Sequence, residues 1–124
     1  MEMDANNLKN EDSELLQLQW SNHQNAFGAA MSKLRNDETF CDVTLVSSEG
    51  KQFSAHKVVI SACSDHLQNM LKPLPRWQHP VLLMPNNLPS QDLKDLLTFM
   101  YSGEVRTTLF HLQSFSVLKS AEYA

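Results

Sequence analysis

The densest run of apolar and β-branched residues in this chain is Phe40-Cys41-Asp42-Val43-Thr44-Leu45-Val46, which Phe53-Ser54-Ala55-His56-Lys57-Val58-Val59-Ile60-Ser61-Ala62 continues. Residues 43–46 alternate between two faces, which is the two-residue period of a strand. Turn residues at 47–50 lead into a returning strand that starts at Phe53. The apolar run at 58–60 is too dense to face solvent. These patterns predict a hairpin followed by a buried apolar segment.

A second segment with the alternation of a strand lies near the N-terminus. Leu16, Leu18 and Trp20 share one face at a period of two residues, opposite two glutamines, and predict a half-buried strand over residues 15–20. The next element along the chain is a helix, so this strand must pair with a distant segment of the same chain or with another copy. Residues 1–14 are polar and acidic and are expected to form a disordered leader.

The first helix is predicted at residues 21–36. Its apolar stripe has the i, i+3, i+4, i+7 spacing of one helix face and consists of Phe27, Ala30, Met31 and Leu34. Such a stripe packs either against the core of its own chain or against another subunit, and the spacing alone fits both.

Short strands and helices alternate along the rest of the chain. We expect a short helix opened by Ser64-Asp65 and stopped by prolines, a strand at 81–84, a helix N-capped by Ser90 and stopped at Gly103, a short strand at 104–106, and a last helix from Thr107 or Thr108. The apolar pattern of that helix is still running at Ala124. The order of elements predicts an α+β fold with helices packed against a small sheet.

Length and composition narrow the class of protein. A chain of 124 residues is expected to be one domain that buries its own core without disulfides or metals. Its formal net charge of -4 argues against direct nucleic-acid contact, because phosphate binding needs clustered Lys and Arg. No apolar run approaches the ~20 residues needed to span a bilayer, so no membrane contact is expected. Cys41 and Cys63 lie in apolar sequence, which favours reduced thiols in the cytosol or nucleus.

Residues that could carry chemistry are scattered. No Ser/His/Asp set, glycine-rich phosphate loop or pair of carboxylates has a catalytic spacing, so neither enzyme activity nor a cofactor is expected. A zinc site could be suspected from four residues, namely Cys41, His56, Cys63 and His66. The first two lie in different elements and no tight ligand pair supports them. Core thiols and a structural, hydrogen-bonding His56 are the favoured interpretation, so no metal is expected.

Three segments in their spacing resemble the BTB (POZ) domain. They are residues 40–45, residues 53–64 and Leu97-Thr98-Phe99-Met100-Tyr101-Ser102-Gly103-Glu104-Val105. The front end is similar to the N-terminal signature of the tramtrack group of insect BTB proteins, and it runs Leu16-Gln17-Leu18-Gln19-Trp20-Ser21-Asn22-His23-Gln24. The resemblance covers residues 15–124, which we therefore expect to be a BTB/POZ domain.

The resemblance implies an α+β BTB/POZ fold with a small three-stranded sheet, a cluster of helices and an N-terminal strand exchanged between subunits. It assigns a swapped dimer interface to the first helix and this strand, with the side chains of Leu16, Leu18, Trp20, Phe27, Ala30, Met31 and Leu34. Asp42 and Lys57 match the family's charged pocket near the dimer groove and are expected to contact a partner. The alternatives for this pair are a structural ion pair or two solvated ends of neighbouring elements. The family's terminal Leu-rich helix is expected to be incomplete here.

The resemblance also implies a function. Domains of the tramtrack group associate with themselves beyond dimers and with related BTB domains, mostly in nuclear regulators whose DNA-binding motifs lie elsewhere. We expect a protein-interaction module that mediates homo- and hetero-oligomerisation of a nuclear transcription or chromatin regulator, with transcriptional co-regulators as further partners. The alternative is a substrate adaptor of a cullin-based ubiquitin ligase, which needs further helices after the BTB core. The loop at 71–79 departs from the group through its Pro-Leu-Pro-Arg-Trp sequence.

Overall fold

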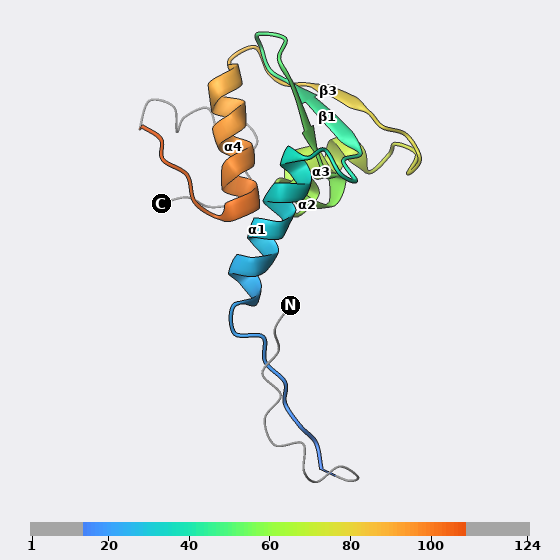
Figure 1. Cartoon of the computed structure of the whole chain (residues 1–124). Coiled ribbons are helices and arrows are strands. Elements are labelled where there is room, and N and C mark those ends of the chain that lie inside the picture. The colour runs from blue at the N-terminus through green and yellow to red at the C-terminus, as the bar shows by residue number, and fades with distance from the viewer. Residues whose placement is uncertain (1–13, 109–124) are drawn as a thin grey trace.

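A computed structural model describes residues 14–108 of the chain, and Figure 1 shows their arrangement. The elements in chain order are α1 (His23–Asn36), β1 (Val43–Val46), β2 (Gln52–Ala55), α2 (Lys57–Cys63), α3 (Asp65–Leu71), β3 (Val81–Leu83) and α4 (Ser90–Ser102). The predicted α+β class is confirmed, because a small mixed sheet packs against a cluster of helices.

The sheet has three strands in the order β2-β1-β3. β1 and β2 form the predicted antiparallel hairpin, in which Val43 pairs with Ala55 and Leu45 with Phe53. The turn between them is organised by Ser47, whose Oγ accepts hydrogen bonds from the backbone N–H groups of Glu49 and Lys51. β3 pairs with β1 in parallel, so α2 and α3 form the connection that brings the chain back to the same end of the sheet.

The core lies between the inner face of the sheet and helices α2, α3 and α4. Its fully enclosed side chains come from all of these elements and include Val43, Leu45, Ala55, Ile60, Leu67, Leu93 and Leu97. One prediction about this region is wrong. Val58 is 74% exposed, because α2 turns the apolar run at 58–60 around a helix axis and points Val58 away from the face that buries Ile60.

The ends of two helices are fixed by polar contacts. Ser64 caps α3 as predicted, with its Oγ accepting a hydrogen bond from the Leu67 N–H at 3.2 Å. Ser90 is not the N-cap of α4 but its first residue, and its N–H donates to Glu49 Oε1 at 2.9 Å. Hydrogen bonds from the side chain and the backbone N–H of Ser90 lower the pKa of the Glu49 carboxyl. The Glu49 carboxylate therefore caps the start of α4, a role that the sequence analysis assigned to Ser90.

Two glycines have positions that side chains would disturb. Gly103 ends α4 as predicted, in the left-handed conformation with φ 86° and its N–H bonded to the Phe99 carbonyl at 2.8 Å. Gly28 lies where α1 crosses the end of α4, and a Cβ atom added there would come within 3.2 Å of the Tyr101 carbonyl oxygen. Gly28 is thus a point of close contact between α1 and α4.

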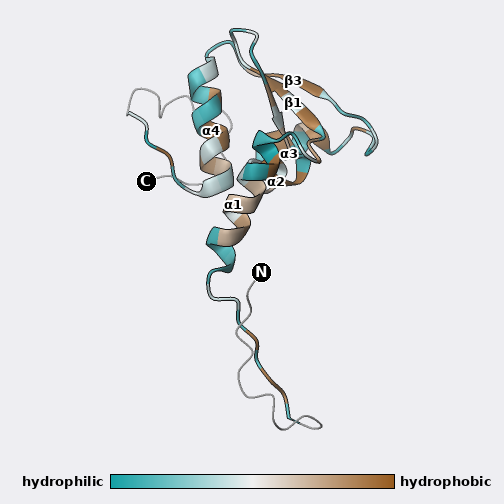
Figure 2. Ribbon diagram, in the orientation of Figure 1, coloured by the Kyte–Doolittle hydropathy of each residue, from teal (hydrophilic) through white to brown (hydrophobic). Residues whose placement is uncertain are grey.

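The N-terminal segment does not join the sheet. Residues 14–22 run away from the body of the molecule below α1, and Figure 2 shows hydrophobic residues along this extended stretch. Leu15 is 99% and Leu18 54% exposed, so the predicted half-buried strand is not half-buried in the single chain, although Gln19 makes an isolated bridge.

The C-terminal part of the described chain also departs from expectation. Residues 104–108 are irregular rather than a short strand, and in Figure 1 they run beside α4 on the side away from the sheet. The predicted leader and last helix lie outside the described residues. Within residues 14–108, no helix combines the length and apolar character that crossing a membrane requires.

Candidate interaction surfaces

Helix α1 presents its apolar stripe at the surface of the single chain. None of its residues, all of which are described, is fully buried, and Phe27 is 55% exposed. Ala30 is exposed as well, whereas Met31 and Leu34 are half-buried. A shallow groove of about 220 Å³ runs beside the stripe, with Phe27 and Met31 on one wall and Val59 and Met100 on the other.

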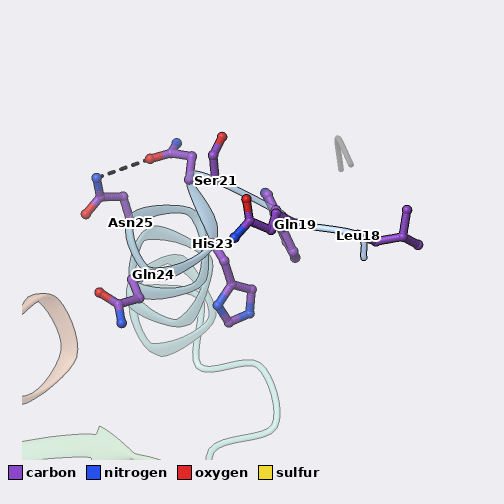
Figure 3. A pocket seen from close by; sticks show the side chains of 8 residues that line it. Leu18, Gln19, Ser21, His23, Gln24 and Asn25 are labelled. Carbon is purple, nitrogen blue, oxygen red and sulfur yellow. Dashed lines mark hydrogen bonds between the residues drawn. The ribbon is translucent and has the colours of Figure 1, made fainter. Parts of the chain in front are cut away.

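Aromatic rings connect the extended N-terminal segment to α1. The ring of Trp20 meets His23 edge-on at 4.8 Å between centroids, and His23 stacks on Phe27 at 5.8 Å. At this junction the chain bends around a hollow of about 690 Å³, shown in Figure 3, where Asn25 donates a hydrogen bond to Asn22 Oδ1 at 3.2 Å. The hollow is lined only by consecutive residues, so it is a bend in the chain rather than an enclosed site.

His56 is a structural histidine, as predicted. The hydroxyl of Tyr101 accepts a hydrogen bond from the His56 N–H at 2.9 Å and lies 2.7 Å from Nδ1. Nε2 lies 2.9 Å from the Thr39 carbonyl, to which it must donate, so Nδ1 is the acceptor of the Tyr101 proton. Burial raises the pKa of Tyr101 to about 12. Both ring nitrogens therefore hold the fold together.

The suspected zinc ligands do not gather around one point. Cys41 Sγ lies 3.8 Å from His56 Nε2, whose hydrogen already points to a carbonyl. Cys63 is the last residue of α2, at the opposite end of this helix from His56, and its thiol donates to the Met100 carbonyl at 3.6 Å. Burial raises the pKa of both thiols, which keeps them protonated. Within residues 14–108, no group of three or more potential ligands could hold a metal ion.

Asp42 and Lys57 lie together but do not form an ion pair. Asp42 Oδ1 accepts a hydrogen bond from the Lys57 backbone N–H at 2.7 Å and thereby caps the start of α2. Lys57 Nζ reaches the other way, to the carbonyls of Arg76 at 3.2 Å and Gln78 at 2.5 Å. The ion-pair alternative is wrong: the one ion pair found in the described part of the chain joins Lys33 and Asp37 on α1.

Both residues line an open groove of about 530 Å³ between α2, α3 and the loop that follows α3. The other side chains that line it are Val58, Ser61, Gln68, Leu71, Lys72, Leu74 and Arg76. The structure therefore places the predicted pair in a concave surface, although its two members act on different parts of the backbone.

Comparison with known proteins identifies the architecture. The model of the BTB/POZ domain family matches residues 31–123, which is most of the chain. The chain belongs to the BTB/POZ family. The BTB fold is a protein-interaction fold.

Relatives of this BTB domain support the resemblance to the tramtrack group. The chain is 43% identical over 112 residues to the Broad-complex core protein of Drosophila melanogaster, covering 90% of this chain and 15% of that protein. It is 40% identical over 98 residues to the alpha isoform of the tramtrack protein from the same fly, covering 79% of this chain and 12% of that protein. It thus spans a small part of the relatives that it matches.

A solved structure confirms the fold of this BTB domain. The BTB domain of zebrafish PATZ1 superposes with a TM-score of 0.70 at 25% sequence identity, and the match covers 83% of this chain and 82% of that one. The expected BTB/POZ architecture of sheet and helices is therefore confirmed.

Two exposed apolar features of the BTB domain, Trp77 and the outer face of β3, differ in how well the sequence indicates their exposure. Trp77, 86% exposed, follows Arg76 in a proline-rich loop, and its position outside any periodic pattern indicated exposure. Val81 and Leu83 lie on the outer face of β3, whose register puts only Leu82 toward the core. A continuous apolar run gives no indication of which face of a strand is covered, so the exposed outer face of β3 could not be found from the sequence.

Proposed function

We propose that this BTB domain is a self-association module of a nuclear transcription or chromatin regulator. A second copy covers the α1 stripe, and related BTB domains can take that copy's place. The observation that carries this proposal is the exposure of Phe27 in a helix with no fully buried residue. A helix with one apolar face obtains most of its stability from packing that face, so α1 needs a partner surface.

The predicted interface residues of α1 form one continuous apolar strip with its groove. Phe27 and Met31 border the groove, while Ala30 and Leu34 extend the strip along the same helix. Covering the exposed half of Phe27 alone contributes about 1 kcal/mol. Interfaces of obligate dimers bury ~2,000 Å² or more, so the strip needs a further contribution from another segment.

The N-terminal segment supplies that contribution in our proposal. Leu16, Leu18 and Trp20 alternate along an extended backbone that lies apart from the sheet of its own chain. Addition of this segment as a strand to the edge of a partner subunit pairs its backbone groups and covers its apolar face. Exchange of the segment between copies thus joins two domains, and exchange among more copies builds assemblies larger than dimers.

We assign the pocket of Asp42 and Lys57 to a further partner, such as a transcriptional co-regulator. The resemblance to the tramtrack group supports both this assignment and a nuclear location. In the relatives, the matched part is a small fraction of the whole protein, which leaves room for the DNA-binding motifs that the resemblance implies.

Sedimentation and light scattering at micromolar concentration test self-association. The chain should be a dimer or larger, and deletion of residues 1–20 should weaken the dimer and remove larger assemblies, because the exchanged segment supplies part of the interface. Phe27→Asp should shift the population to monomer. Trp77→Asp is the matched control, because Trp77 is also exposed but lies in the loop between α3 and β3, outside the groove beside α1. A monomeric wild-type chain would exclude the proposal, and large assemblies that survive the deletion would exclude strand exchange as their cause.

A further inference from the structure

The groove between α2, α3 and the following loop has a charge opposite to that of the whole chain. Its lining includes three cationic side chains, Lys57, Lys72 and Arg76, and one carboxylate, Asp42. The chain as a whole has a formal net charge of -4. One oxygen of Asp42 already accepts the Lys57 N–H, which offsets part of the negative charge in the groove. A local positive surface on an acidic protein selects partners of negative charge.

The cations are held by the fold to different degrees. Lys57 Nζ donates to two loop carbonyls, and Arg76 Nη1 donates weakly to the Lys72 carbonyl at 3.4 Å. Lys57 thus holds the loop against α2, and the guanidinium of Arg76 keeps further N–H groups for a ligand. Lys72 is exposed at the C-terminal end of α3. The wall of the groove is therefore pre-organised, which lowers the entropic cost of binding.

Apolar side chains accompany these charges. Val58 and Leu74 line the groove with the buried Leu71 beneath them, and Trp77 projects into solvent directly after Arg76. Exposed tryptophan and arginine are the residue types most often responsible for binding energy at protein interfaces. The combination suits an apolar side chain flanked by carboxylates better than an isolated anion.

We infer that this groove docks an acidic peptide segment of a partner protein, with one apolar side chain of the segment on Val58 and Leu74. The carboxylates of the segment pair with Lys72 and Arg76, and Trp77 covers its apolar residue. The inference rests on the pocket assigned to a partner above, and it adds the chemical class of that partner. It also gives a role to the Pro-Leu-Pro-Arg-Trp loop, which departs from the pattern of the tramtrack group.

A peptide selection on the full chain tests the inference. A random peptide library is selected against the immobilised protein, and the recovered peptides are measured by fluorescence anisotropy. The variants are Lys72→Glu, Arg76→Glu and Trp77→Ala. Lys94→Glu is the matched control, because it makes the same charge change at an exposed position of α4 outside the groove. Denaturation curves confirm that each variant is folded.

The selected peptides should be acidic, with an apolar residue between carboxylates. They should bind the wild type and Lys94→Glu equally, and they should bind Lys72→Glu, Arg76→Glu and Trp77→Ala about tenfold more weakly or worse. Their affinity should fall as salt is added. Neutral or basic peptides, equal binding to Lys72→Glu, or no recovered peptide would each overturn the inference. Binding of a single-stranded oligonucleotide that Lys72→Glu abolishes would overturn it in favour of a nucleic-acid ligand.

Sedimentation of the same proteins separates this inference from the proposed self-association. If the wild-type chain assembles but binds no acidic peptide, the inference of an acidic partner is excluded and the proposed self-association is not. If the wild-type chain is a monomer that binds the acidic peptides through Lys72 and Arg76, self-association is excluded and the acidic partner is not.

Discussion

The hydroxyl of Tyr101, near the end of α4, satisfies both the backbone N–H and the ring Nδ1 of His56, at 2.9 and 2.7 Å. His56 is the residue that joins β2 to α2, and its Nε2 holds the Thr39 carbonyl before β1. One phenol therefore fixes the relative positions of the hairpin, α2 and α4.

Tyr101→Phe should lower the free energy of unfolding by about 1–3 kcal/mol, because it leaves the buried His56 N–H and Nδ1 without their partner. Urea denaturation followed by circular dichroism measures the change. Ser102→Ala is the control, since it removes an exposed hydroxyl of the same helix, and it should stay within about 0.5 kcal/mol of the wild type. Equal effects of the two substitutions would show that the phenol contributes nothing specific.

Glu49→Gln should remove a pH-dependent part of the stability. The hydrogen bonds from Ser90 lower the pKa of Glu49, so its stabilising effect is fully present above the ordinary glutamate pKa of about 4.3 and is lost as pH falls through the lower, folded-state pKa. The free energy of unfolding of the wild type should exceed that of the variant at neutral pH, and the two values should converge in strong acid. Denaturation at a series of pH values checks this, with Glu104→Gln as an exposed control. A difference that does not change with pH would contradict it.

Glu38→Gly should stabilise the fold by about 0.5–1 kcal/mol. Glu38 follows α1 with φ 56°, a left-handed conformation that costs most side chains energy and costs glycine little. The loss of its exposed hydrogen bond from Ser54 is a small offset. Thermal unfolding measures the gain. Asn36→Gly, in the last turn of α1, should instead destabilise the chain by up to about 1 kcal/mol, and a gain there would show that the benefit is unrelated to φ.

Gly28→Ile should destabilise the domain by about 1–3 kcal/mol, because its side chain meets the Tyr101 carbonyl and forces α1 away from α4. Ala29→Ile, one residue further along α1 at an exposed position, should cost much less. Thermal unfolding of the two variants compares them. Similar losses would mean that helix propensity, and not close contact, sets the cost at Gly28.

Lys57→Met should loosen the loop after α3. The substitution keeps a long side chain but removes the donor to the Arg76 and Gln78 carbonyls. Hydrogen exchange of residues 72–80 should become faster, while Lys72→Met should leave it unchanged. Unchanged exchange in Lys57→Met would show that the loop is held by other contacts.

The parts of this fold that repeat with a strict period could be predicted from the sequence. The alternation at 43–46 gave the hairpin and the buried Val43 and Leu45. Prediction from the sequence did not reach the contacts in which a side chain serves a distant backbone group. The ion-pair alternative for Asp42 and Lys57 is wrong, because each residue binds main-chain atoms, and no side-chain pattern encodes such a bond. Prediction from the sequence failed at Val58, because apolar density does not say which face a short helix turns inward.

The parallel pairing of β1 with β3 has a consequence for the order of events during synthesis. The hairpin of β1 and β2 leaves the ribosome first, but its neighbour β3 follows only after α2 and α3. Until then the open edge of β1 is available to other chains, which makes the nascent domain prone to mispairing at this edge. Such distant pairing also slows folding, since a long loop must close before its contacts form. A pause in translation after β3 would therefore protect this domain from mispairing better than a pause before β3.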